Sequence, residues 1–203
     1  MQFKAKTVLL AVMTLSMGFA GTATAFEPGD WLMRIGASYV SPASDNHAIV
    51  DVQSATSATF NFSYMMTDVW AVEVLAAWPF KHDLELADET KIGSTKHLPP
   101  TVSLQYHFRP TEQLQPYIGV GLNFTSFFSE KTTGPLAGSD LDLSSSWGIA
   151  GQIGFDVMFN DKWFFNVDVR YIDIDTKAKL DGQSIGKVEI DPFIYGAHIG
   201  FRF

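Results

Sequence analysis

The side chains with which this chain could do chemistry are its histidines, serines and carboxylates, and their spacing matches no catalytic motif. A serine hydrolase needs a histidine base beside its nucleophilic serine, which is often held in a Gly-x-Ser-x-Gly turn. No such turn accompanies His107 or His198, and both histidines stand in segments of alternating polarity. We therefore expect no catalytic residues, and we expect both histidines to belong to an internal polar network.

The sequence supports metal binding no better than it supports catalysis. His82 and His97 fall within one connecting segment, without the spacing of paired metal ligands. The acidic run that begins at Asp173 fails the calcium-loop pattern, because Lys177 and Ala178 stand where that pattern has an oxygen ligand and a glycine. The absence of cysteine excludes thiolate ligands and disulfide bonds. The sequence predicts neither a metal nor a cofactor.

Alternation of apolar and polar residues is the dominant pattern of the chain, and it is clearest at the C-terminus. The last segment places an apolar side chain at every second position: Phe193, Tyr195, Ala197, Ile199, Phe201 and Phe203. Period-two alternation predicts a β-strand with one apolar face. A phenylalanine as the last residue of such a strand, here Phe203, resembles the signal by which outer-membrane barrels are recognised for assembly.

Seven earlier segments alternate in the same way. We predict eight strands in all, near residues 31–39, 58–64, 70–78, 102–108, 118–124, 147–157, 163–171 and 193–203. An even number of antiparallel strands suits a closed membrane barrel. The predicted fold is all-β, an eight-stranded antiparallel transmembrane β-barrel.

Charged side chains within these segments share the less apolar face. They are Arg34, Glu73, His107, Asp156, Asp168, Arg170, His198 and Arg202. An Arg or Lys on the lipid face at mid-bilayer costs roughly 2–4 kcal/mol, so this face should line the barrel interior. An eight-stranded barrel is narrow enough for side chains to fill it, and we expect the charges to pair there. Leu75 and Arg170 should narrow the lumen and block straight passage.

Aromatic residues fall where interfacial girdles belong in a membrane barrel. Trp31, Trp70, Tyr117 and Trp163 would form one girdle, and Tyr39, Trp78, Trp147 and Tyr171 the other. The alternative is a soluble lipocalin-like barrel or sandwich, which would bury the apolar face and expose the charges to water. Alternation alone does not separate these folds. The girdles, the terminal phenylalanine and the even strand number favour the membrane barrel.

The N-terminus indicates export. Lys4 and Lys6 precede an apolar run, and Ala23-Thr24-Ala25 has the small-x-small pattern of a signal-peptide cleavage site. The alternative, a membrane anchor, needs roughly 20 apolar residues, more than this run supplies. We therefore expect residues 1–25 to be a cleaved signal and residues 26–203 to form one barrel domain. The predicted location is the outer membrane of a Gram-negative bacterium.

Connection lengths predict the orientation of the barrel. The links after the second, fourth and sixth segments are short, whereas the others are long, near residues 41–55, 81–99, 129–145 and 173–189. Short periplasmic turns and long extracellular loops are usual in these barrels, with both termini in the periplasm.

Several segments carry a specific resemblance. His97-Leu98-Pro99-Pro100-Thr101, residues 116–128, residues 146–154 and residues 171–176 resemble motifs of the OmpW family of small outer-membrane proteins, in family order. The resemblance extends over essentially the whole predicted mature chain, and the AlkL type, associated with uptake of alkanes, is a related kind. It implies an eight-stranded barrel whose outer half forms an apolar channel that opens sideways into the membrane.

Residues for such a channel can be proposed from their types and places. Large apolar side chains on or beside the long links would form a funnel: Leu84, Leu86, Ile92, Leu98, Phe127, Phe128, Leu136, Leu141 and Leu143. Proline donates no ladder hydrogen bond, so a lateral opening is expected near Pro42, Pro79, Pro99, Pro100 and Pro192. Both sets have a plainer interpretation, since prolines also end strands and loop leucines also pack on one another.

Two functions remain open from sequence alone. The favoured one is passive uptake of small hydrophobic molecules, and the alternative is a structural or receptor barrel whose loops bind a phage, a bacteriocin or a host surface. Expected partners are outer-membrane lipid and lipopolysaccharide, the barrel-assembly machinery and a small hydrophobic substrate. With 22 acidic against 14 basic residues, a nucleic-acid partner is not expected.

Overall fold

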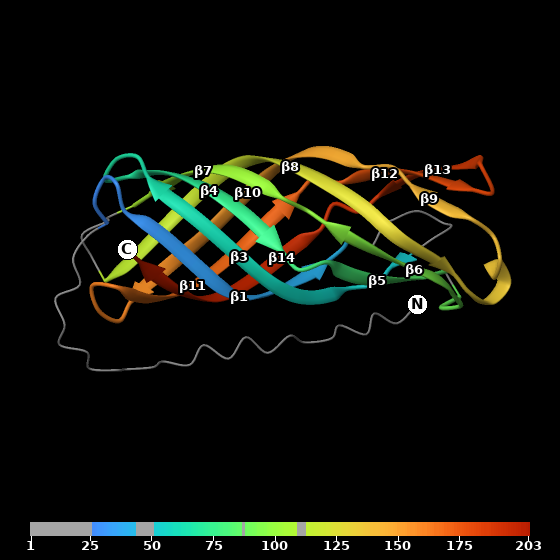
Figure 1. Cartoon of the computed structure of the whole chain (residues 1–203), viewed down its shortest axis with the longest axis horizontal. Helices are drawn as coiled ribbons and strands as arrows, with labels where there is room; N and C mark the ends of the chain where they lie inside the picture. Colours follow the sequence, from blue (N-terminus) through green and yellow to red (C-terminus); the bar gives the residue numbers. More distant parts are fainter. Residues whose placement is uncertain (1–25, 44–50, 87, 109–112) are drawn as a thin grey trace, which may run out of the picture.

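The computed structural model describes residues 26–43, 51–86, 88–108 and 113–203 (Figure 1). The predicted signal segment, residues 1–25, lies outside this part of the chain. Within the described ranges no helix has the length and apolarity needed to span a membrane.

Eight long antiparallel strands close into a ring. Around the ring the order is β1, β3, β4, β7, β8, β10, β11 and β14, and β14 pairs again with β1. Their bounds are β1 Trp31–Ser41, β3 Ala55–Met65, β4 Trp70–Ala77, β7 Thr101–His107, β8 Leu114–Thr132, β10 Ser146–Met158, β11 Trp163–Ile172 and β14 Phe193–Arg202. The eight predicted strands are confirmed, and the fold is an eight-stranded antiparallel β-barrel.

The closing seam joins the first and the last strand of the barrel. β1 and β14 pair from Leu32 opposite Arg202 to Ser41 opposite Phe193. Beyond the ladder, the amides of Trp31 and Phe203 each donate to the other's carbonyl oxygen at 3.0 Å. Each of the eight strands is therefore hydrogen-bonded to a neighbour on both sides, which is the condition for strands to cross a bilayer.

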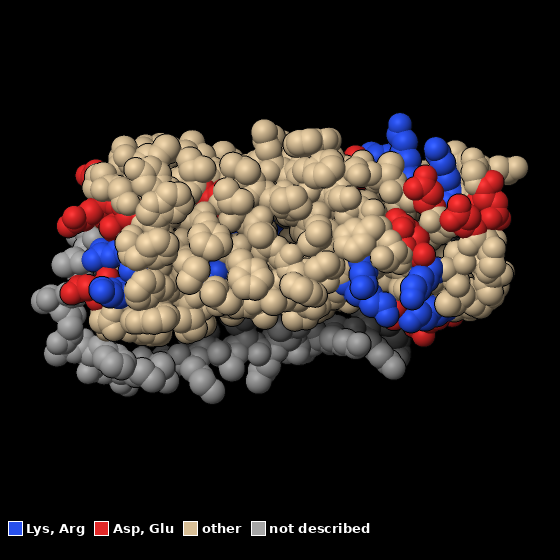
Figure 2. Space-filling model, in the orientation of Figure 1, with Lys and Arg blue, Asp and Glu red and all other residues tan. Residues whose placement is uncertain are grey.

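On the face that Figure 2 shows, the outer surface of the barrel is a broad apolar band, nearly free of charged side chains between two charged ends. Seven of the eight predicted girdle residues lie on it, from Trp70 and Tyr171 at 40% exposed to Trp147 at 75%. The prediction for Tyr117 is wrong. It is 1% exposed, because strand alternation turns it inward, and its hydroxyl accepts a hydrogen bond from Asn166 Nδ2 at 3.0 Å.

The four long links all contain secondary structure that the sequence did not predict. They hold β2 Asp51–Val52, β5 Phe80–Glu85, β6 Lys91–Leu98, the 3-10 turn η1 Gly134–Leu136, β9 Leu141–Leu143, β12 Asp175–Leu180 and β13 Gln183–Glu189. β6 pairs with the upper part of β8, so that β8, β6, β5 and β2 extend the wall beyond the barrel. β9, β12 and β13 form a separate small sheet at the same end (Figure 1).

Buried side chains fill the barrel in three layers. At the end that carries the extension, an apolar layer is formed by residues that include Val40, Ala55, Ile172 and Ile194. Polar and charged side chains from Arg34 to His198 occupy the middle of the strands. At the end that carries the short turns, Phe26, Leu32, Met65, Ala71, Met158 and Phe164 form a second apolar layer.

The seam depends on a close approach at Gly36. A side-chain carbon there would overlap the backbone oxygen of Ala197 on β14, whereas one at Gly151 would meet nothing within 4 Å. We expect Gly36→Ala to destabilise the barrel by about 1–3 kcal/mol, the usual cost of overpacking. Gly151→Ala is the matched control and should be neutral. Urea-induced unfolding of the refolded protein in lipid vesicles measures both, and equal stability of the two variants would contradict the expectation.

Candidate functional site

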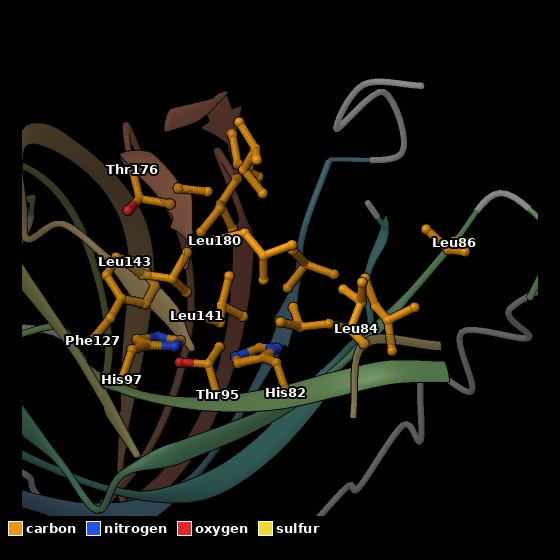
Figure 3. Close-up of a pocket in the computed structure, with 17 residues that line it drawn as sticks. His82, Leu84, Leu86, Thr95, His97, Phe127, Leu141, Leu143, Thr176 and Leu180 are labelled. Carbon is orange, nitrogen blue, oxygen red and sulfur yellow. The ribbon is translucent and has the colours of Figure 1, made fainter. Parts of the chain in front are cut away.

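An apolar cavity of about 400 Å³ lies in the extension above the barrel (Figure 3). One wall comes from β2, β5, β6 and the upper part of β8, and the facing wall from η1, β9, β12 and β13. The lining residues are Val52, His82, Leu84, Leu86, Ile92, Thr95, His97, Phe127, Leu136, Leu141, Leu143, Thr176, Ala178, Leu180, Ile185, Val188 and Ile190. A concave site of this size, mostly apolar with a few polar groups, is typical of small-molecule binding.

Seven of the nine predicted funnel residues line this cavity. They are Leu84, Leu86, Ile92, Phe127, Leu136, Leu141 and Leu143. The structure places Leu98 and Phe128 outside it. His97 and Phe127 point into the cavity, so their neighbours along the strand, Leu98 and Phe128, point to the opposite face, where both are half-buried.

Sequence reasoning missed most of the facing wall. Thr176, Ala178 and Leu180 line the cavity at alternate positions of β12, and Val188 and Ile190 follow after the turn into β13. The alternation at 176–180 was a usable signal. Lysines stand between these positions, and the segment lies within one of the long links, in which no strand is predicted.

His82 and His97 form a stacked pair on the wall of the cavity. Their ring centroids are 4.8 Å apart at 19°, and the other face of His97 stacks on Phe80 at 5.4 Å. Burial lowers the pKa of His82, and burial together with the neighbouring His82 lowers the pKa of His97 to about 3. Both rings are therefore neutral at physiological pH, which fits an apolar site.

Below the cavity, the barrel lumen is closed by an ion network. Arg34 binds Asp156 with both Nε and Nη2, at 3.1 and 2.8 Å, and its Nη1 lies 3.4 Å from Glu73. Arg170 binds Glu73 at 2.7 Å and Asp168 at 2.8 Å. All five side chains are at least 97% buried, so this bundle of charges plugs the lumen.

The other predicted lumen residues lie around this network. His198 Nδ1 is 3.4 Å from Asp168, and His107 Nε2 is 3.2 Å from Gln105, which in turn donates to Glu73 at 2.9 Å. Leu75 is 4% exposed and points inward. Arg202 is not part of the plug, because it lies near the end of the chain and its Nη1 is 3.5 Å from Asp30.

The five predicted prolines lie where barrel strands meet the extension. Pro79 joins β4 to β5, Pro99 and Pro100 join β6 to β7, and Pro42 and Pro192 flank the top of the β1–β14 seam. β4 pairs with β7 as far as Leu75 opposite Thr101. The next pair above it is Phe80 opposite His97, which belongs to the ladder between β5 and β6. The wall therefore has a gap in its hydrogen-bond ladder, immediately below the histidine pair.

On the side away from β4, the segment that contains Pro99 and Pro100 is hydrogen-bonded to β8. The amide of Phe124 donates to the carbonyl oxygen of Pro100 at 3.0 Å. The side-chain amide of Asn123 donates to the carbonyl oxygens of Pro99 and Pro100, both at 3.2 Å. The gap in the ladder is thus confined to the side that faces β4.

A model of a protein family, the OmpW family, matches residues 27–203, the whole barrel and its extension. The chain belongs to the OmpW family. Outer membrane protein W of Vibrio cholerae is 41% identical over 198 residues, which cover 88% of this chain and 91% of the relative. This chain is therefore a barrel of the Gram-negative outer membrane.

Solved structures of OmpW-family and related barrels agree with this fold. The crystal structure of OprG from Pseudomonas aeruginosa has a TM-score of 0.77 and 34% identity, covering 90% of this chain and 99% of OprG. The solid-state NMR structure of outer membrane protein AlkL in lipid bilayers has a TM-score of 0.68 and 26% identity, covering 93% and 97%. AlkL of Ectopseudomonas oleovorans is 29% identical over 196 residues, which cover 88% of this chain and 84% of AlkL.

Acidification should loosen the pairing of β5 with β6. An unfolded histidine binds a proton below pH 6.5, whereas folded His97 stays neutral down to about pH 3, so the folded extension loses stability as pH falls between these values. For His97 the loss at pH 5 is about 2 kcal/mol, and none is expected above pH 7. Hydrogen exchange of the β5 and β6 amides at pH 7.5 and pH 5, corrected for intrinsic rates, measures it.

His97→Phe is the control for that experiment, since it keeps an aromatic ring between Phe80 and His82 but removes the titrating group. Most of the pH dependence should disappear in this variant. Equal protection of the wild-type extension at the two pH values would contradict the assignment.

The lumen plug should contribute strongly to stability. Arg34→Met leaves the buried carboxylates of Asp156 and Glu73 without their shared partner, which costs about 3–5 kcal/mol for pairs of this kind. Lys91→Met is the matched control, because Lys91 binds Asp83 at 2.7 Å on an exposed surface, where a pair contributes about 1 kcal/mol or less. Chemical unfolding in lipid vesicles compares the two, and similar losses would show that the plug does not brace the barrel.

Proposed function

We propose that this protein is a passive channel that takes small hydrophobic molecules from outside the cell into the outer membrane. The observation that carries the proposal is the apolar cavity above the barrel, since it faces the extracellular side and ends over a plugged lumen. Two apolar layers and the ion network fill the barrel beneath it. A molecule that enters the cavity therefore has no straight path to the periplasm.

The same arrangement supports release sideways into the membrane. The gap in the ladder between Leu75–Thr101 and Phe80–His97 lies at the level where the cavity ends. An apolar molecule gains about 0.8 kcal/mol for each methylene that passes from water into the acyl region, so no energy source is needed. We propose that Pro79, Pro99 and Pro100 keep this exit open by withholding ladder hydrogen bonds.

Similarity to AlkL supports a shared mode of action across this family. The structural alignment with AlkL covers 93% of this chain at a TM-score of 0.68, and the AlkL type is the one that the sequence resemblance associates with uptake of alkanes. The chemistry of the cavity in this chain fits that association, because most of its lining side chains are aliphatic.

The channel is tested by the initial rate at which cells take up a labelled medium-chain alkane. Leu84→Asn combined with Leu141→Asn should reduce this rate several-fold, because two amides in the cavity raise the cost of passing a hydrocarbon. Phe128→Asn is the matched control, since Phe128 lies outside the cavity, on the opposite face of the same wall and away from the gap in the ladder, and it should leave uptake unchanged.

A labelled sugar, expected to enter equally with and without the protein, controls for leaky membranes. If alkane enters at the same rate with and without folded protein, the transport proposal fails. The alternative of a receptor barrel, whose extracellular segments bind a phage, a bacteriocin or a host surface, would then be favoured.

A further inference from the structure

The cavity is not uniformly apolar, because four of its lining side chains carry polar atoms: His82, Thr95, His97 and Thr176. Thr176 is already satisfied, since its hydroxyl donates to the carbonyl oxygen of Ser144 at 2.7 Å. The other three lie together on β5 and β6, beneath the leucines of the facing wall (Figure 3). All three are at least 96% buried, and this polar spot needs a physical explanation.

The protonation of His82 follows from its one hydrogen bond. Its Nδ1 lies 2.5 Å from the backbone oxygen of Gln53, which can only accept, so Nδ1 carries the proton. Burial lowers the pKa of His82, and the ring is neutral. The second nitrogen, Nε2, therefore bears a lone pair, and among the described residues this buried atom has no hydrogen-bond partner.

Neither His97 nor Thr95 donates a hydrogen bond to His82 Nε2. His97 stacks face to face on His82, a geometry in which its N–H groups do not point at the His82 lone pair. Thr95 stands directly opposite His82 on β6, but its hydroxyl is directed to the backbone oxygen of Lys96 at 3.4 Å. The unmatched atom is thus a buried acceptor on a residue that lines a cavity of ligand size.

We propose that this cavity selects hydrophobic molecules that carry a hydroxyl group, with the O–H donating to His82 Nε2 and the apolar body lying among the leucines. An alkane leaves the acceptor unpaired, and a carboxylate has no hydrogen to donate. Long-chain alcohols and apolar phenols are the matching chemical class. The inference rests on the proposed function, because it names the preferred substrate of the same cavity.

The first test is direct and uses the wild-type protein. The barrel is labelled with ¹⁵N-histidine, placed in lipid nanodiscs and titrated with 1-decanol or with decane. We expect 1-decanol to shift the His82 Nε2 resonance upfield, as for an imidazole acceptor that gains a hydrogen bond, and decane to leave it in place. His82→Phe assigns the signal by its disappearance.

The second test compares uptake rates of 1-decanol and decane by cells. We expect His82→Phe to lower the alcohol-to-alkane ratio about tenfold, the factor for one hydrogen bond of ordinary strength, while decane uptake persists. Thr132→Val is the matched control, because Thr132 does not line the cavity and its hydroxyl already donates to the carbonyl oxygen of Ser139 at 2.7 Å, and it should leave the ratio unchanged.

The outcomes separate the two proposals. If decane and 1-decanol both enter through the wild-type barrel, but the His82 resonance does not respond and the ratio is unchanged in His82→Phe, the hydroxyl preference is wrong and the channel stands. If the protein accelerates entry of neither compound, the proposed function itself fails.

Discussion

The hydrogen-bonded seam between β1 and β14 joins the first and the last strand of the barrel, and the other features of the barrel depend on it. A bilayer offers no water to unpaired backbone groups, so strands can cross it only as a closed ring. Ten residue pairs and the reciprocal bonds between Trp31 and Phe203 close that ring here. The seam needs glycine at position 36, where the two backbones come too close for a side chain. Closure also creates an interior, narrow and shielded from water, that side chains must fill.

What fills the interior determines what the protein can do. A buried charge is tolerated only with a partner, and the two arginines of the lumen meet this condition by bridging strands across the barrel. Arg34 on β1 reaches Asp156 on β10 and Glu73 on β4, and Arg170 on β11 reaches the same Glu73. The network therefore braces opposite walls and occupies the space through which a solute would pass. The space for a ligand lies instead in the extension, where the cavity is enclosed between the wall that contains β5 and β6 and the sheet that contains β9 and β12.

The sequence predicted the membrane part well because lipid imposes one simple rule on each strand. Period-two alternation correctly assigned the strands and the faces of residues such as Arg34 and Glu73, and it would also have turned Tyr117 inward had it been applied strictly. The extension follows this rule only in part, as in β12. Six of the seven residues of β13, Gln183–Glu189, are exposed, so that strand has no apolar face to read. Treating the links as loops also hid the alternation that turns Leu98 and Phe128 away from the cavity.

The position of the ladder gap relative to the plug favours a sideways route on energetic grounds. A molecule that moved straight down would have to separate buried pairs such as Arg34–Asp156, and each broken pair costs about 3–5 kcal/mol. A molecule that moved sideways below His97 would meet prolines, which have no ladder hydrogen bond to lose. Asn123 holds the opposite edge of the proline segment to β8, so opening on the β4 side leaves the remaining wall intact. The buried charges of the lumen thus support the proposal that a hydrophobic molecule leaves through the wall.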